Sequence, residues 1–310
     1  MPPLISMVMA VYNGSRFLEA QVHSILKQSY KNFELVVVDD VSSDDSFDIL
    51  TRLARSEPRI KLHKNVANVG IVGNFLNALR YSCGELVCFA DQDDIWREDK
   101  LEILSALILK SPENMLAYSD LEICDSNLKT IHPSFWKVSG IRPRSGVLGE
   151  FAFFRNIAPG CSMMFRNEIR DVLLQTLPKS SFIHDHLAFV LASLRGRVVY
   201  SRQRLVKYRQ HAMNNIGAFY PSVTDFERFS EQLRREIMLL KPALTTDLSD
   251  LERFLSVRGR EKIFPRLTFL RFYLWLRIDS FFSKCLGLFE CLTPSFYQQC
   301  RRGFHAYRAV

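Results

Sequence analysis

Continuous apolar runs alternate with amphipathic segments along the first 120 residues, and this alternation restricts the chain to few folds. LISMVMAV (4–11) has the composition of a strand that is buried on both faces. The same composition is found in FELVVVDD (33–40) and GELVCFAD (84–91). In contrast, the apolar residues of SRFLEAQVHSILKQS (15–29) have helical spacing, with Ser15 as the expected N-cap. Strand, helix, strand in this order predicts an α/β fold, a mostly parallel sheet with helices on both faces.

The chain divides by pattern into three regions. Residues 1–120 hold the regular alternation, residues 121–220 are less regular, and residues 221–310 are helical and basic. The remaining expected elements are helices over 42–56, 73–82, 97–110 and 182–196, a short strand over 60–63, strands near 119–127 and 157–165, and one or two strands within 197–211. The sequence thus predicts an α/β body followed by a C-terminal helical extension.

Composition narrows the class of protein and the class of partner. A chain of 310 residues with 47% hydrophobic and 24% charged residues is typical of a globular protein. Its net charge of +8 favours an anionic partner: nucleic acid, acidic lipid or a phosphorylated substrate. Seven scattered cysteines without a CxxC pair or zinc spacing indicate a reducing compartment. With neither a signal peptide nor a membrane span recognisable, we expect a cytoplasmic protein.

Polar residues follow the strands at the places where a parallel sheet binds its ligands. Ligands of such sheets lie beyond the carboxyl ends of the strands. Those positions hold Tyr-Asn-Gly (12–14), Asp-Asp (39–40), the segment 65–70 and Asp-Gln-Asp-Asp (91–94). The pattern predicts a site for a small polar ligand at this edge of the sheet.

The segment FADQDDIW (89–96) carries three carboxylates directly behind a buried strand. Clustered carboxylates repel one another unless a cation lies between them, and hard divalent cations take oxygen ligands and share them with phosphates. Asp91 and Asp93 therefore suggest a metal and diphosphate site. Acids also commonly precede helices, so Asp94 is equally well explained as a cap of the helix expected near Arg97. The residues alone leave both explanations open.

Several motifs in one order resemble the inverting family 2 glycosyltransferases of GT-A fold. These are VMAVYNGSRFLEAQVHSILKQSYKNFELVVVDDVSSDDS (8–46), NVGIVGNFLNAL (68–79) and GELVCFADQDDIWREDKLE (84–102), followed more weakly by PGCSMMF (159–165), HDHLAFVLAS (184–193) and YRQHAMNNIG (208–217). The DQDDIW form with the later YRQH looks most like bacterial rhamnosyltransferase-type members. One departure is Ala10, which stands where the family often has proline.

The resemblance implies a GT-A, Rossmann-like fold and a nucleotide-diphospho-sugar donor. It makes 1–120 the nucleotide-sugar-binding half, 121–220 the acceptor-binding half, and 221–310 a helical region. The residues it places on the nucleotide sugar are Val11, Tyr12, Asn13, Asp40, Asn68, Gly70, Asn74, Asp91 and Gln92, with Asp39 as the neighbouring acid. It places Asp93 on Mg²⁺ or Mn²⁺ and makes His211 a candidate third ligand or diphosphate contact.

An inverting transfer needs a base that takes the proton of the acceptor hydroxyl. Asp185 matches the family's base, although His184 stands where the family usually has Glu. Asp185 is also explained as the N-cap that begins the helix over 182–196, and the helix dipole is expected to lower its pKa. The flanking His184 and His186 either shape the acceptor pocket or are exposed.

The segment 267–292 reads as a long aromatic helix with a narrow basic stripe. Arg266, Arg277 and Lys284 fall on one side of a helical wheel, and most of the rest is Leu, Phe, Tyr, Trp or Ile. Such a helix fits a membrane interface, and it equally fits a helix packed on the protein's own sheet. The first explanation predicts peripheral contact of residues 260–292 with the inner face of the cytoplasmic membrane.

The leading hypothesis is an inverting, metal-dependent transferase that acts in bacterial surface-polysaccharide synthesis on a glycan or lipid-linked acceptor. The motif form points to dTDP-rhamnose as donor, with glucose, galactose and their N-acetyl forms open. One alternative is a sugar-nucleotide nucleotidyltransferase, which the single glycine of the first loop, AVYNGSRF, disfavours. The other is a membrane-bound or nucleic-acid-binding scaffold, but the acid cluster would repel a phosphate backbone, so no nucleic acid partner is expected. The sequence does not determine the oligomeric state.

Overall fold

A computed structural model describes residues 2–149, 151–154, 156–180 and 182–211, together with Arg235, Met238 and Leu239. The chain divides into two compact units, Met1–Glu252 and Arg253–Val310, and all described residues belong to the first. The predicted C-terminal helical extension, with its segment 260–292, lies outside the described residues.

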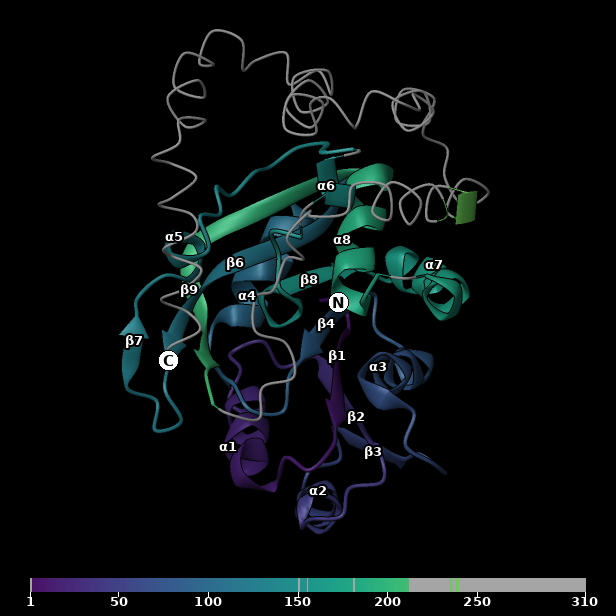
Figure 1. The fold of residues 1–310 in the computed structure, drawn as a ribbon, viewed down its shortest axis with the longest axis vertical. Helices are drawn as coiled ribbons and strands as arrows, with labels where there is room; N and C mark the ends of the chain where they lie inside the picture. The colour runs from purple at the N-terminus through teal and green to yellow at the C-terminus, as the bar shows by residue number, and fades with distance from the viewer. Residues whose placement is uncertain are drawn as a thin grey trace, which may run out of the picture. The chain divides into compact units, whose positions relative to one another are not determined.

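One mixed sheet of nine strands forms the body, in the order β3-β2-β1-β4-β8-β6-β9-β5, with β7 paired to β6 (Figure 1). The strands are β1 (Ile5–Val11), β2 (Phe33–Asp39), β3 (Ile60–Lys64), β4 (Leu86–Ala90), β5 (Ile95–Trp96), β6 (Asn114–Cys124), β7 (Thr130–His132), β8 (Met163–Arg166) and β9 (Arg197–Arg209). The strands β1, β2 and β4 are almost fully buried, as their continuous apolar runs predict.

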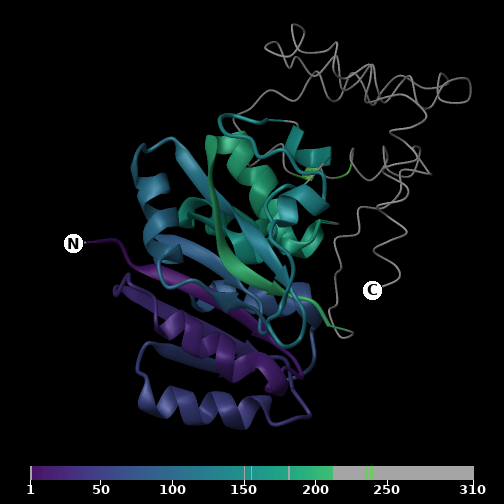
Figure 2. The same ribbon diagram turned by 90° about the vertical axis from the view of Figure 1, so that its left-hand side faces the viewer.

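Helices cover both faces of the sheet (Figures 1 and 2). They are α1 (Ser15–Leu26), α2 (Ser46–Ser56), α3 (Gly70–Tyr81), α4 (Lys100–Leu109), α5 (Phe135–Val138), α6 (Phe151–Phe154), α7 (Asn167–Thr176) and α8 (His184–Arg195), with 3₁₀ turns η1 (Gly160–Ser162) and η2 (Leu177–Lys179). Along the chain, the strands are added outward from β1 through β2 to β3, and the next strand, β4, then pairs with the other side of β1. Because such crossovers are right-handed, α1 and α2 lie on one face and α3 on the other.

The strand directions bring several loops to one edge of the sheet, including the loop 65–70 after β3, which is parallel to β2. Strands β1, β2 and β4 are parallel, with Ile5 opposite both Phe33 and Leu86, so they end together. Because β8 is antiparallel to β4 and to β6, its beginning lies at the end of both. Strand β9 is parallel to β6 and ends at the same edge. This edge therefore gathers the segments 12–14, 39–40, 65–70, 91–94, 159–162 and 209–211.

The α/β prediction is confirmed, and the structure corrects several local expectations. Helix α1 begins at Ser15, and Gly14 occupies the cap position. Helix α4 begins at Lys100, three residues later than expected. Strand β6 begins at Asn114, and β9 is one strand of 13 residues. Helix α7 was not predicted, although Ile169, Val172, Leu173 and Thr176 have helical spacing and are buried.

Candidate active site

The acid loop 91–94 links β4 to β5 and is held from several directions. The Asp91 carbonyl accepts a hydrogen bond from Gln21 Nε2 at 3.0 Å. Arg209, at the end of β9, donates its Nε to the Asp93 carbonyl at 2.6 Å and its main-chain N–H to Asp94 Oδ1 at 3.1 Å. The Arg209 guanidinium also lies over the Phe17 ring, 4.4 Å from its centroid. The loop conformation is thus fixed by contacts with α1 and β9, both distant in sequence.

Asp94 is not a helix cap, which corrects one of the two explanations left open by the sequence. Its side chain is fully buried, α4 begins six residues later, and the cap position there is Asp99. Asp94 Oδ2 has no hydrogen-bond partner within the described part of the chain. A buried carboxylate oxygen without a partner is costly, so this atom calls for a cation or proton nearby.

All three acids of the loop resist ionisation. Burial raises the pKa of Asp91 to about 7, with further increases from Asp93 and Asp185. Burial, followed by the charges of Asp93 and Asp91, raises the pKa of Asp94 well above its usual range. The pKa of Asp93 is also raised by burial, although its contact with His211 opposes the shift. The cluster therefore has the electrostatics of a site that gains stability from added positive charge.

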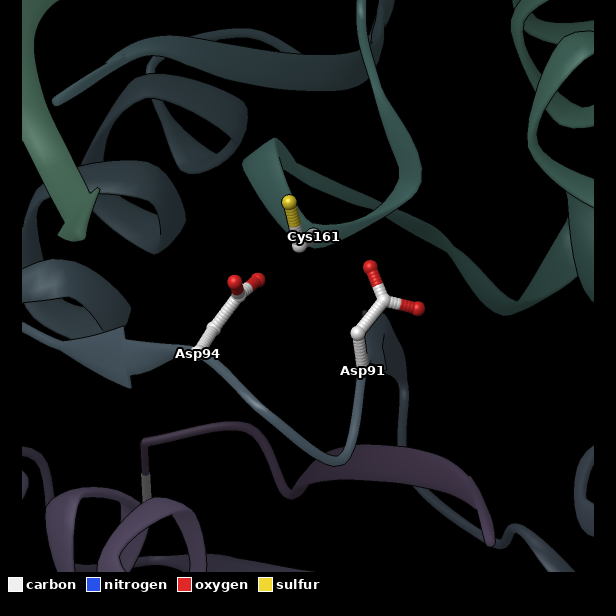
Figure 3. A group of neighbouring side chains, drawn as sticks. All are labelled: Asp91, Asp94 and Cys161. Carbon is white, nitrogen blue, oxygen red and sulfur yellow. The ribbon is translucent and has the colours of Figure 1, made fainter. Parts of the chain in front are cut away.

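Part of that charge is supplied by the protein itself. Lys100 is fully buried, and its electrostatic partners include Asp94 and Asp91. Burial lowers the pKa of the Lys100 ammonium to about 8. Cys161, from the turn η1, completes the group: its Sγ and the carboxylate oxygens of Asp91 and Asp94 lie within 4.8 Å of one another (Figure 3).

Asp93 and His211 form the part of the cluster that fits a divalent cation. His211 Nε2 lies 2.8 Å from Asp93 Oδ2, and the two side chains keep 10% and 15% exposure. The His211 ring stacks on Phe17 with centroids 4.8 Å apart. Carboxylate oxygen and imidazole nitrogen are ligands of divalent metals, although Mg²⁺ prefers oxygen. The raised pKa of Asp93 agrees with this fit.

Asp185 lies beside the η1 turn, near enough to Asp91 for its charge to raise the pKa of that carboxyl. Its Oδ2 accepts the Gly160 N–H at 3.0 Å, and its Oδ1 accepts the His186 N–H at 2.6 Å. Helix α8 begins at His184, and the cap residue, Ile183, makes no side-chain cap. The expectation that the helix dipole lowers the pKa of Asp185 is wrong. Burial raises it to about 6, so this carboxylate is a stronger base than an exposed one.

The two histidines beside Asp185 are held in different ways. His184 is buried, which contradicts the exposed alternative, and its ring stacks on Phe75 with centroids 3.9 Å apart. Burial lowers the pKa of His184 to about 3, so its imidazole is neutral. His186 Nε2 contacts the Ala152 carbonyl at 2.8 Å. Both rings pack against the protein and fix the beginning of α8.

Tyr12, Asn13 and Gln92 form the rim between β1 and the acid loop. The Gln92 amide bonds both main-chain groups of Tyr12: Oε1 accepts its N–H at 2.9 Å and Nε2 donates to its carbonyl at 3.1 Å. Asn13 has a positive φ of 49° and accepts the Ser43 N–H at 2.8 Å. A Cβ on Gly14 would come within 2.4 Å of Gln92 Oε1, so this contact needs glycine. The Tyr12 ring keeps 47% exposure and is available to stack on a ligand.

Asp40 organises the loop that precedes α3. Its carboxylate accepts the N–H groups of Val69 and Gly70, each at 2.9 Å, and the Asn65 side chain at 2.7 Å. Asn68 donates to the Asp40 carbonyl at 3.1 Å. Asp40 thus already has partners on both carboxylate oxygens, and its proposed contact with the nucleobase stays a prediction.

Asn74, Val11 and Asp39 are buried beneath this rim. Asn74 Nδ2 donates to the carbonyls of Val11 and Val38 at 3.3 and 3.0 Å, so it joins the ends of two strands. The Val11 side chain is fully buried. Asp39 is also fully buried, yet its Oδ1 has no partner within the described part of the chain. The sequence analysis named Asp39 only as the acid next to Asp40. Its partnerless Oδ1 makes Asp39 a stronger candidate for a ligand contact than its sequence position suggested.

Sequence reasoning missed Lys100, Cys161 and Gly160 and gave Arg209 only a supporting place. Each acts through a tertiary contact that no local pattern encodes. The only available signals were the apolar setting of Cys161 in PGCSMMF and the position of Lys100 at the start of an apolar helix.

The described architecture, an α/β sheet with an acid loop at one edge, matches the predicted GT-A fold. The glycosyl transferase family 2 profile matches residues 6–173, more than half of the 310 residues. The chain therefore belongs to glycosyl transferase family 2. This membership confirms the predicted enzyme class, a glycosyltransferase, and removes the nucleotidyltransferase and scaffold alternatives.

Similar proteins agree on the family and differ in substrate. The Escherichia coli UDP-Glc:alpha-D-GlcNAc-diphosphoundecaprenol beta-1,3-glucosyltransferase WfgD is 39% identical over 125 residues, which are 40% of this chain and 48% of the relative. The chain thus spans about half the length of that relative. The Shigella flexneri dTDP-rhamnosyl transferase RfbG is 26% identical over 255 residues, 77% of this chain and 85% of the relative.

Solved structures support the fold. The crystal structure of Staphylococcus aureus TarS 1–349 in complex with UDP-GlcNAc covers 84% of this chain and 73% of its own, with 19% identity and a TM-score of 0.59. A mannosyltransferase from Pyrobaculum calidifontis in complex with GDP-Man and Mn²⁺ covers 98% of this chain and 84% of its own, with 16% identity and a TM-score of 0.53. At these identities the likeness shows the fold alone.

Proposed function

We propose that the protein transfers a sugar, with inversion, from a nucleotide-diphospho-sugar to a glycan or lipid-linked glycan in bacterial surface-polysaccharide synthesis. The observation that carries the proposal is the arrangement at one sheet edge. The acid loop 91–94 and the carboxylate of Asp185 both border the turn at Gly160 and Cys161, and Asp185 lies near enough to Asp91 for its charge to raise the pKa of that carboxyl. Such an arrangement brings a base and a site for the charge of the leaving group to one reacting carbon.

Asp185 is the proposed base. Its two oxygens are oriented by the N–H groups of Gly160 and His186, and its raised pKa of about 6 gives it more affinity for the acceptor proton. As the acceptor oxygen attacks the anomeric carbon, Asp185 takes the hydroxyl proton and the bond to the nucleoside diphosphate breaks. The neutral His184 beside it does not compete for that proton at physiological pH.

Asp93 and His211 are the proposed ligands of a divalent cation, Mg²⁺ or Mn²⁺. When bound, such a cation neutralises charge on the departing diphosphate. Asp91, facing the ribose or the metal, and Gln92 are the proposed contacts of the acid loop with the nucleotide sugar. Tyr12, Asn13, Asp40, Asn68 and Gly70 form the proposed rim around the nucleoside, which Val11 and Asn74 support from below.

The relatives support two donors. RfbG, named as a dTDP-rhamnosyl transferase, covers most of this chain, whereas WfgD, named as a UDP-Glc transferase, is more similar over a shorter stretch. We therefore rank dTDP-rhamnose first and UDP-glucose second. The name of WfgD also contains a diphosphoundecaprenol-linked acceptor, which supports a lipid-linked acceptor here. That acceptor suits a protein at the inner face of the cytoplasmic membrane.

A donor screen tests the proposal directly. Purified full-length protein is heated with dTDP-rhamnose, UDP-glucose, UDP-GlcNAc or GDP-mannose, each with Mn²⁺ and with EDTA. A ligand at 100 times its Kd adds about 2.7 kcal/mol to the unfolding free energy and raises Tm. We expect one donor to raise Tm in Mn²⁺ and far less in EDTA. If none does, and none is consumed with lipid-diphosphate-linked sugar as acceptor, the proposal is wrong.

A further inference from the structure

Lys100 is a buried cation to which the proposed chemistry gives no role. Its side chain is fully buried, and Nζ donates to the Cys161 carbonyl at 2.6 Å. Nζ also lies over the Trp96 ring, 3.1 Å from the centroid. A buried ammonium is retained only where specific partners hold it, and here they are one carbonyl, one ring and two nearby carboxylates.

The Cys161 carbonyl belongs to the turn η1, which contacts both the acid loop and Asp185. Gly160, one residue earlier, donates its N–H to Asp185 Oδ2 at 3.0 Å. The approach is close, since a Cβ on Gly160 would lie 3.3 Å from the Asp185 Cβ. The Cys161 thiol lies close to the carboxylates of Asp91 and Asp94 (Figure 3). Two adjacent residues of η1 thus connect the two functional carboxylate groups.

We propose that Lys100 is a positioning residue that holds the η1 turn so that the Gly160 N–H orients the Asp185 carboxylate. Lys100 comes from α4, which follows the acid loop in the chain, so it ties the base to the half of the site that holds the acids. A base displaced by about 1 Å loses about 10²-fold in rate. The expected loss of rate rests on the proposed function, whereas the expected loosening of the η1 turn does not.

The first experiment separates the hydrogen bond from the charge. Lys100→Met keeps length and removes both, whereas Lys100→Gln keeps a donor and removes the charge. With the donor found in the screen, we expect Lys100→Met to lower kcat 10- to 100-fold with the donor KM within twofold. Lys100→Gln should recover part of that loss. The matched control Lys110→Met, at the exposed end of the same helix, should equal wild type.

Gly160→Ala tests the same displacement without removing a buried charge. Its Cβ would lie 3.3 Å from the Asp185 Cβ, so one of the two must shift by a few tenths of an ångström, and we expect a smaller fall in kcat at an unchanged donor KM. If Lys100→Met fails to fold, the comparison of Lys100→Gln with wild type decides the role of Lys100. The proposal is overturned if Lys100→Met keeps the wild-type kcat, or if its donor KM rises as much as its kcat falls. It is also overturned if Lys100→Met and Lys100→Gln lose the same factor in kcat.

Amide hydrogen exchange supplies a readout that needs no substrate. In Lys100→Met the amides of residues 160–162 and 185–187 should exchange at least tenfold faster, with α2 unchanged. Unchanged exchange at residues 160–162 overturns the proposal even when the enzyme is active. If instead wild-type protein transfers no sugar but exchange responds as expected, the proposed function fails and the positioning role stands.

Discussion

Asp185 shows at the scale of one residue how burial adapts a common side chain to a special task. Its pKa is raised to about 6, so it is protonated below that pH and is a competent base above it. The same shift lowers the free energy of unfolding at neutral pH, because the folded state binds more protons at this group than the unfolded state between about pH 4 and 6. Stability from this group therefore falls as pH rises through that window.

We expect Asp185→Asn to lower kcat by 10²- to 10⁴-fold, because the amide cannot take the acceptor proton. Wild-type kcat, measured at saturating donor and metal, should fall below about pH 6. Urea unfolding at pH 7 should show that the variant is still folded, because the removal of a poorly solvated charge offsets the loss of one acceptor for the Gly160 or His186 N–H. A variant that turns over normally would remove Asp185 as the base.

Asp93 and His211 form a second pair whose role can be tested one residue at a time. If they hold the cation, Asp93→Ala and His211→Ala should each weaken Mn²⁺ binding by at least tenfold, because one ligand is lost in each case. Calorimetric titration with Mn²⁺ alone gives this affinity without donor. His23→Ala, which changes an exposed histidine of α1, is the control. Equal Mn²⁺ affinity in all four proteins would contradict the assignment.

At the scale of elements, the loop before α3 depends on a single carboxylate. Asp40 accepts two main-chain N–H groups and one amide, so Asp40→Asn turns an acceptor into a donor against at least one of them. We expect a loss of roughly 1–3 kcal/mol in unfolding free energy, measured with urea, and weaker donor binding. The exposed Asp48 of α2 gives the control Asp48→Asn, which should stay within about 0.5 kcal/mol of wild type.

The same scale explains what the sequence could predict. Strands β1, β2 and β4 were predictable because parallel strands buried on both faces need continuous apolar runs. The full extent of β9 was not predictable, because three exposed polar or charged residues at 202–204 interrupt its apolar pattern. The acid loop was identifiable as a site from its position after β4.

The separate roles within the acid loop were not predictable. Asp94 reads locally as a cap, and only the tertiary structure shows it buried against Arg209 from 115 residues away. Lys100 reads as an ordinary first-turn residue for the same reason. Charged residues are rarely buried, so local patterns assign them to the surface, and their exceptions at functional sites are found only from packing.

At the scale of the whole molecule, the strand order gathers the site from loops across the chain. Donor-side residues come from the parallel half and the base from the segment after β8, because β8 reverses direction beside β4. Within the described residues no helix is both long and apolar enough to cross a membrane. For contact with a lipid-linked acceptor, the sequence predicts a role for the basic, aromatic segment 260–292, which lies outside the described residues.

Charge reversal in the full-length protein tests that contact. The double variant Arg277→Glu, Lys284→Glu replaces two basic residues of the stripe by acids. Each basic residue near an anionic surface contributes about 1 kcal/mol to binding. We therefore expect binding to vesicles with about 30% anionic lipid, measured by flotation, to fall at least tenfold. The control, Arg55→Glu with Lys61→Glu, makes the same change in net charge at exposed positions of α2 and β3. If the segment packs on the protein instead, the two double variants should float alike, and the stripe variant should lose Tm.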